Sequence, residues 1–206
     1  LLFVPALAIG AAAVQLEKAP VSTEPAALQH GAKLFVNYCL NCHSASYVRY
    51  NQLQKIGLSD QMIEDNLLFT GTKVGDLMSI SMTRADGIAW FGVAPPDLSV
   101  IARSRASGDG SGADWLYTYL RQFYRDHERP TGWNNVIFSN VGMPHVFWQL
   151  QGEQVANITD NPDGTKKIEL SLAKPGLMSV EEYDKAVGDL VSFLVWMGEP
   201  VAEKRK

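Results

Sequence analysis

Residues 39–43 read Cys39-Leu40-Asn41-Cys42-His43, two cysteines three positions apart with a histidine directly after the second. This C-x-x-C-H pattern is typical of covalent c-type haem attachment, because two thiols on one helical turn can form thioethers to the two vinyl groups of one porphyrin. The adjacent imidazole then lies beneath the iron as an axial ligand. Zinc sites and thioredoxin-like sites also use a C-x-x-C pair, but this chain has neither a second cysteine pair nor a preceding β-α-β pattern. The motif therefore predicts one haem c, attached through Cys39 and Cys42, with His43 on its iron.

The composition indicates a globular domain with a sizeable core. Of the 206 residues, 46% are hydrophobic and 19% are charged, and the formal net charge is -4. Nucleic acid is not expected as a partner, because phosphate binding calls for clustered lysine and arginine. The mild acidity fits a basic protein partner better. Both cysteines belong to the haem motif, so no disulfide framework indicates a compartment.

Residues 1–14 form an apolar run, LLFVPALAIGAAAV, that is too short to span a bilayer as a helix and ends in small alanines. We interpret this run as the remnant of a signal peptide, with a buried N-terminal helix as the alternative. Export would place the remaining domain, residues 15–206, outside the cytoplasmic membrane, where c-type haem is normally attached. Retention of Leu1 in the mature protein, found by N-terminal sequencing, would contradict this interpretation.

Apolar residues at helical spacing predict a helix that leads into the haem motif. It begins near Thr23, as a capping residue, and Pro25, in the first turn. Gly31 lies in this helix and would allow another helix to approach closely. Further on, the glycine-rich residues 108–114 are predicted to be a flexible loop. An amphipathic helix with an aromatic inner face is predicted at residues 115–123.

The last fifty residues predict a surface hairpin followed by one long helix. Residues 155–172 contain an Asp-Gly pair between β-prone arms, which is typical of a hairpin turn. Ser179 and Glu182 have the spacing of a capping box, so they mark the start of a helix over residues 180–197. Its apolar residues recur at helical spacing and are expected to face the core.

Residues 130–148 contain the candidate for the second axial ligand. An electron-transfer cytochrome usually needs a sixth ligand, and methionine with histidine raises the reduction potential. Met143 lies in a segment without helical periodicity, where a loop can present its thioether to the iron. His145 is the competing ligand, because imidazole also binds haem iron. The remaining methionines are interpreted as core or helix residues: Met62, Met78, Met82, Met178 and Met197.

Two arginines follow a break in the chain at residues 94–99, Ala-Pro-Pro-Asp-Leu-Ser. The break opens a short helix that contains Arg103 and Arg105. A solvated charged face is one interpretation of this pair. The other is that Arg105 binds a haem propionate, because a guanidinium group matches a carboxylate in a bidentate way.

Four stretches together resemble the cytochrome c1 family, the haem-bearing subunit of the ubiquinol:cytochrome c reductase (cytochrome bc1) complex, in a bacterial form. They are CLNCHSASYVRYNQL at residues 39–53, APPDLSVIARSR at residues 94–105, the segment 133–148, and DLVSFLVWMGEPVAEKR at residues 189–205. The resemblance covers residues 16–206. It implies a mainly α, cytochrome c-like haem domain with long loop insertions and a small β-hairpin.

The resemblance also implies a set of ligands and partners. Thioethers form at Cys39 and Cys42, His43 and Met143 bind the iron, and Arg105 matches the family's second arginine after P-P-D-L-S, which is associated with the propionates. Electrons arrive from a Rieske iron–sulfur protein and leave to cytochrome c, next to a cytochrome b subunit. The domain then lies on the periplasmic face of the bacterial inner membrane and does no bond-making chemistry of its own.

Acidic residues offer a way to guide a basic cytochrome c toward this domain. Asp126 and Glu128 are the candidates, and such steering weakens as salt rises. Electron-transfer rates that do not depend on ionic strength would contradict it. Membrane attachment rests on the resemblance alone, because the C-terminal membrane helix of the family is not present in this sequence.

The sequence departs from the family pattern next to the proposed methionine ligand. The family often has alanine and several prolines there, whereas this chain has Gly142, Pro144 and His145 around Met143. His145 therefore stays an alternative ligand. The alternative function is a haem enzyme or gas sensor with an open sixth coordination site, which rapid carbon monoxide binding by the reduced protein would reveal.

Overall fold

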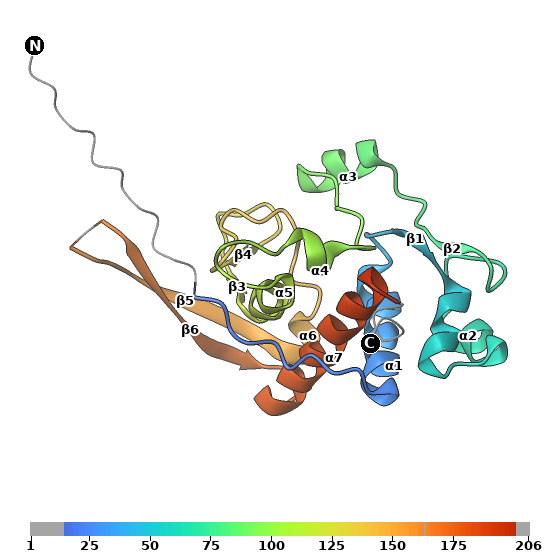
Figure 1. Ribbon diagram of the computed structural model, residues 1–206. Coiled ribbons are helices and arrows are strands. Elements are labelled where there is room, and N and C mark those ends of the chain that lie inside the picture. The colour runs from blue at the N-terminus through green and yellow to red at the C-terminus, as the bar shows by residue number, and fades with distance from the viewer. Residues whose placement is uncertain (1–14, 163, 201–206) are drawn as a thin grey trace, which may run out of the picture.

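The structure is a computed structural model that describes residues 15–162 and 164–200. Helices pack around an apolar core, together with small antiparallel two-stranded sheets (Figure 1). The helices are α1 (Pro25–Leu34), α2 (Asp60–Asn66), α3 (Arg84–Phe91), α4 (Ile101–Ser104), α5 (Gly112–Arg121), α6 (Trp148–Gln151) and α7 (Val180–Gly198), with a π-helical turn η1 (Phe35–Cys39) and a 3₁₀ segment η2 (Tyr50–Ile56). The strands pair as β1 (Ala45–Arg49) with β2 (Leu77–Met78), β3 (Phe123–Arg125) with β4 (Trp133–Asn135), and β5 (Gly152–Asp160) with β6 (Lys166–Pro175). The predicted mainly α fold with a small hairpin is confirmed.

The packing of α1 against α7 forms the centre of the core (Figure 1). The capping box predicted at the start of α7 is present, because Ser179 accepts from the Glu182 amide and Glu182 accepts from the Ser179 amide. Gly31 is the point of closest approach, since a Cβ added to it would lie 2.1 Å from the Asp189 carbonyl oxygen. The rings of Phe35 and Phe193 meet beside it with centroids 5.6 Å apart. This contact fixes the end of α1, from which the haem motif follows directly.

Replacing Gly31 by alanine is expected to lower the free energy of unfolding by about 2 kcal/mol. Overpacking in a core typically costs about 1–3 kcal/mol, and here the added methyl group meets backbone, which cannot move aside. The better helix propensity of alanine offsets at most about 1 kcal/mol of this cost. Denaturant unfolding of the haem-loaded protein measures the difference.

The matched control for this prediction is Gly108→Ala, because a Cβ added at Gly108 meets nothing within 4 Å. Its unfolding free energy should stay within about 0.5 kcal/mol of the unchanged protein. If Gly31→Ala is as stable as Gly108→Ala, α1 and α7 can separate without cost and the close contact does not hold the core together.

Residues 15–24 are bound to helices that follow much later in the chain. The Glu17 amide donates to Thr118 Oγ1 (2.8 Å) and the Ala19 amide donates to Asp114 Oδ1 (2.8 Å), both on α5. The Ser22 amide donates to an α7 hydroxyl, Ser192 Oγ (2.9 Å). Backbone groups of an irregular segment need such partners when they are covered. The segment therefore ties α5 and α7 to the start of α1.

The predicted surface hairpin is longer than expected. Strands β5 and β6 pair from Gly152 with Pro175 to Asp160 with Lys166, with one irregularity at Glu153. The hairpin extends away from the helices (Figure 1). Strand β5 packs against β3, whose Phe123 and Tyr124 are buried. The hairpin is thus joined to the domain at β3 and α6.

Two predicted helix starts differ from the structure. Thr23 is not the cap of α1, because the capping position is Glu24 and its side chain makes no capping bond, although Pro25 occupies the first turn as predicted. The glycine-rich residues 108–114 are not all loop, since α5 begins within them at Gly112. A Cβ at Gly112 would lie 1.9 Å from the carbonyl oxygen of an α4 residue, so this glycine allows α4 and α5 to touch.

Some predictions concern residues that the structure does not describe. The predicted signal-peptide remnant, residues 1–14, lies outside the described residues, as does Asp163 at the predicted hairpin turn. Within residues 15–162 and 164–200, no helix combines the length and apolar character needed to cross a bilayer.

Candidate haem-binding site

The haem motif lies on a tight turn at the end of η1. A π-type bond from the Leu40 amide to the Phe35 carbonyl (3.0 Å) ends the helix. The amides of Cys42 and His43 then both donate to the Cys39 carbonyl, at 3.0 and 2.9 Å. This turn places both thiols and the imidazole on the wall of one cavity. The backbone therefore brings the two thiols and the imidazole of the C-x-x-C-H motif to one side of a single turn, as the motif predicts.

The cavity has a volume of about 1150 Å³, which includes the solvent-filled space at its open mouth. Its walls come from the motif, from residues 91–98, from α4, α5 and α7, and from the loop 138–146. They are mainly apolar, and the contributions from α7 are Leu190 and Leu194. Among the described residues that line these walls, Arg105 is the one whose side chain carries a permanent charge. A flat apolar group that carries negative charge at one edge suits such a cavity.

His43 is held by a backbone carbonyl. Its Nδ1 lies 2.7 Å from the Pro96 oxygen, so Nδ1–H donates to that carbonyl and Nε2 is left available as a ligand. Burial lowers the pKa of His43, although the Pro96 carbonyl and Asp97 oppose this in part. The neutral imidazole is the form that binds iron. Asp97 in turn accepts from the amides of Ser46 and Ser99 (both 2.8 Å), which fixes the Pro96 carbonyl in place.

Cys39 and Cys42 are both free thiols. Burial raises the pKa of Cys39 to about 12, with a smaller contribution from neighbouring Cys42. Burial also raises the pKa of Cys42. Both thiols therefore keep their protons near neutral pH, as expected for side chains that face an apolar cavity rather than a cation.

The loop that carries Met143 is held by two buried asparagines of β4. Asn134 Oδ1 accepts from the Asn140 amide (2.9 Å), and Asn135 Oδ1 accepts from the Ile137 amide (3.1 Å). Asn135 Nδ2 donates to the Tyr119 carbonyl on α5 (2.8 Å). Asparagine side chains often replace missing backbone partners in loops in this way. The loop thus has a defined path along α5, although it lacks regular structure.

Within this loop, Met143 lines the cavity and Tyr119 contacts its sulfur. The Tyr119 hydroxyl donates to Met143 Sδ at 3.5 Å. Burial raises the pKa of Tyr119, which keeps the hydroxyl protonated. The glycine at position 142 has a steric reason, because a Cβ there would lie 2.8 Å from Val93 Cγ1 and 3.0 Å from the Phe91 carbonyl oxygen. Glycine lets the loop lie against this opposite wall.

His145, the competing ligand, does not line the cavity. It is 2% exposed and its ring stacks on Phe123 with centroids 4.9 Å apart and an interplanar angle of 5°. The edge of Trp133 meets it at 5.0 Å. Burial lowers the pKa of His145 to about 4, and the Gln151 side chain opposes this only in part. The structure therefore places Met143 at the cavity and His145 in an aromatic cluster behind it.

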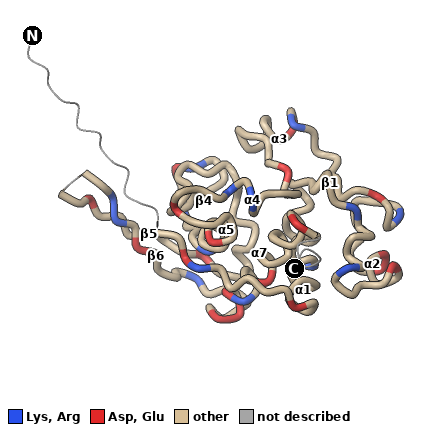
Figure 2. Tube along the Cα trace, in the orientation of Figure 1, with Lys and Arg blue, Asp and Glu red and all other residues tan. Residues whose placement is uncertain are grey.

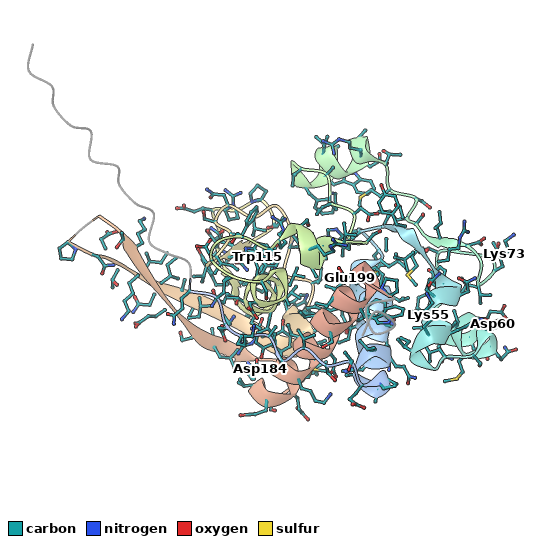
Figure 3. All side chains as sticks on the ribbon, in the orientation of Figure 1. Lys55, Asp60, Lys73, Trp115, Asp184 and Glu199 are labelled. Atoms are coloured by element: carbon teal, nitrogen blue, oxygen red, sulfur yellow. The ribbon has the colours of Figure 1, made fainter. Side chains whose placement is uncertain are left out.

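Arg105 stacks on aromatic rings at the edge of the cavity. Its guanidinium carbon lies 4.5 Å from the ring centroid of Trp115 and 5.6 Å from that of Phe138. Trp115, labelled in Figure 3, lies on α5 and also lines the cavity. The neighbouring Arg103 instead forms an ion pair with Glu199 (3.4 Å), as a solvated surface arginine does. The two arginines of the segment thus have different surroundings.

The model of the cytochrome C1 family matches residues 17–206. The chain belongs to the cytochrome c1 family. It is 46% identical over 187 residues to cytochrome c1 of Allochromatium vinosum, covering 89% of this chain and 74% of that relative. It is also 50% identical over 194 residues to a Nitrosomonas europaea protein named ammonia monooxygenase gamma subunit, covering 94% of this chain and 77% of that protein.

A more distant relative carries the cofactor in its name. The cytochrome c1 of Arabidopsis thaliana named as a mitochondrial heme protein is 23% identical over 202 residues, covering 90% of this chain and 60% of that relative. As in the cytochrome c1 family, the cofactor of this chain is haem c. The cavity fits this group on its own terms, because its walls provide two free thiols, an imidazole and a thioether around an apolar space with one cation.

Sequence reasoning missed the residues that hold the methionine loop. Asn134 and Asn135 carry no motif, and nothing in their spacing indicates which loop amides they bind. Tyr119 was expected mainly as a packing residue of an aromatic helix face, and its contact with Met143 spans 24 positions. Its position on the apolar stripe of a helix, together with a hydroxyl group that seeks a partner when buried, was the only indication.

Proposed function

We propose that this chain relays single electrons within the cytochrome bc1 complex, from a Rieske iron–sulfur protein to cytochrome c. Membership of the cytochrome c1 family makes it an electron-transfer c-type cytochrome of that complex. The observation that supports the relay is the presence of Cys39, Cys42, His43 and Met143 on the walls of one apolar cavity. An imidazole and a thioether that both bind the iron would leave no iron position for oxygen or a substrate, which favours electron transfer over catalysis.

In this proposal each residue of the site has one task. Cys39 and Cys42 would hold the haem through thioethers, and His43 Nε2 and Met143 Sδ would bind its iron. When bound, the haem would supply the one-electron chemistry. The Pro96 carbonyl orients the imidazole, and Leu190 and Leu194 of α7 help to exclude water. Residues 15–206 would then form one cytochrome c-like haem domain.

The location and the partners belong to the same proposal. Residues 15–206 would lie on the periplasmic face of the inner membrane, beside a cytochrome b subunit, after removal of a leader that includes residues 1–14. Figure 2 shows lysine and arginine interspersed with aspartate and glutamate along the described trace. Steering by Asp126 and Glu128, which lie between β3 and β4, therefore stays a prediction, and a salt series of electron-transfer rates to cytochrome c tests it.

Carbon monoxide tests the relay against a haem enzyme or gas sensor. In the haem-loaded complex, reduced with dithionite at neutral pH, the α-band of this cytochrome should not change when carbon monoxide is added, because both axial positions are filled. The protein should also exchange one electron per chain reversibly in a redox titration. Rapid carbon monoxide binding by the unchanged protein would overturn the proposal and support the open-site alternative.

Arg105→Gln is expected to lower the reduction potential of the haem. We propose that Arg105 binds a haem propionate, because it is the fixed cation on an apolar wall and its stacking on Trp115 holds the fork in place. A nearby positive charge opposes the ferric state, so its loss should favour that state by about 1 kcal/mol. Redox titration measures the shift.

Arg105→Lys is the comparison for this prediction, since it keeps the charge and loses the fork, and it should shift the potential less. Arg103→Gln is the matched control, because Arg103 pairs with Glu199 outside the cavity. Equal potentials for Arg105→Gln and Arg103→Gln would remove Arg105 from the haem site.

A further inference from the structure

The Tyr119 hydroxyl is aimed at one atom. Tyr119 lies on α5 and is 8% exposed. Within the described residues, the hydrogen-bond partner of its hydroxyl is Met143 Sδ. The distance of 3.5 Å suits a bond to sulfur, which is larger and a weaker acceptor than oxygen. The side chain is long enough to reach into the cavity from α5 and ends at the atom that we propose as an axial ligand.

The Tyr119 ring has little freedom to turn away from this contact. Trp115 stacks on one face, with centroids 4.7 Å apart and an interplanar angle of 15°. Phe123 and Phe138 meet the ring edge-on at 5.0 and 6.3 Å. The guanidinium carbon of Arg105 lies over the Trp115 ring, 4.5 Å from its centroid. Close packing of this kind holds a side chain in one rotamer, so the direction of the hydroxyl is set by the fold.

The Met143 side of the contact is fixed as well. Asn135 bonds the Tyr119 carbonyl with its amide group and the Ile137 amide with its oxygen, so α5 and the methionine loop share one buried side chain. Gly142 lets the loop lie against Val93 on its other side. Hydroxyl and sulfur are therefore brought together by two elements that are themselves tied to each other.

We propose that Tyr119 is a positioning residue that donates a hydrogen bond to the Met143 sulfur and thereby raises the reduction potential of the haem. The inference rests on the proposed ligation by Met143. A thioether sulfur has two lone pairs, and a donor on one of them draws electron density away from the other. The sulfur then supports the electron-poor ferric state less well, while the ferrous state loses little. Hydrogen bonds to ligands are one of the means by which proteins set haem potentials.

The test is Tyr119→Phe in the haem-loaded complex, because this change removes the hydroxyl and keeps the ring in its aromatic packing. The ferric to ferrous ratio at a fixed potential should rise about threefold, the size expected when a neutral hydrogen bond differs between two states. For one electron this corresponds to a fall of about 28 mV in the midpoint potential. The far-red absorption band of methionine–ferric ligation should also shift, which loss of packing alone would not cause.

Tyr117→Phe is the matched control. Tyr117 is also buried on α5 and also loses only a hydroxyl, but it does not line the cavity and its ring contacts Arg121 instead. Its potential should equal that of the unchanged protein. Equal potentials for Tyr119→Phe and Tyr117→Phe, with both variants folded as judged by thermal unfolding, would overturn the inference.

A double variant separates this inference from the proposed function. In Met143→Leu the volume is kept and the acceptor is lost, so adding Tyr119→Phe should leave the potential where it is. If Tyr119→Phe shifts the potential as much in that background, the hydroxyl acts elsewhere and the inference fails. If Met143→Leu itself leaves the spectrum unchanged, the proposed ligand fails first and the inference falls with it.

Discussion

Replacing both Cys39 and Cys42 by alanine should abolish covalent haem. The two thiols are free, lie on one turn and line the same cavity, and the sequence contains no other cysteine to replace them. A denaturing gel should lose haem staining at the mass of this chain, and the pyridine haemochrome should report no covalent haem. An immunoblot on the same gel is needed, because a chain whose open apolar cavity lacks its haem is expected to accumulate poorly.

Single variants make this expectation more specific. Cys39→Ala or Cys42→Ala should keep haem on one thioether, with the haemochrome band displaced because one vinyl group stays conjugated with the ring. Asn41→Ala is the control from within the motif, since its side chain is exposed and donates to the Asn37 carbonyl. It should retain full haem content. Haem that survives denaturation in the double variant would contradict attachment at these cysteines.

The parts of the fold that the sequence predicts well are those whose cause is local. The capping box at Ser179 and the apolar repeat that follows it lie within one helix, and the C-x-x-C-H motif lies within one turn. Each can be derived from neighbouring residues. The bond from His43 to Pro96 spans 53 positions and depends on how the chain folds back, so the motif predicts the ligand but not the carbonyl that orients it.

The choice between Met143 and His145 shows where local reasoning ends. The two residues are two positions apart in a loop, and both are chemically suited to iron. Which of them faces the cavity depends on the path of the loop, and Asn134 and Asn135 of β4 determine that path. Position 142 is glycine where the family often has alanine. A Cβ there would clash with Val93, so the close contact between the loop and Val93 favours glycine. These causes come from residues that only the folded chain brings together.

Met143→Leu should convert this cytochrome into one that binds carbon monoxide. Leucine is similar in volume to methionine but offers no lone pair, so the iron would lose one axial ligand while the cavity stays filled. The reduced variant should bind carbon monoxide rapidly at neutral pH. Its potential should fall by on the order of 0.1–0.3 V, within the roughly 0.8 V over which axial ligands set haem potentials. Absorption spectra with and without carbon monoxide, and a redox titration, measure both effects.

His145→Phe completes the comparison, because it removes the competing imidazole from its place between Phe123 and Trp133 and keeps an aromatic ring there. The spectrum, the carbon monoxide response and the potential should all match those of the unchanged protein. If His145→Phe opens the iron and Met143→Leu does not, the ligands are exchanged relative to our proposal. That outcome would require the loop to turn by two residues on haem attachment. The turn would break the bond between Tyr119 and the sulfur, and it would withdraw His145, which is 2% exposed, from its aromatic cluster. The hydrogen bonds from the loop amides to the buried side chains of Asn134 and Asn135 oppose such a rearrangement, and this is the physical reason to expect Met143.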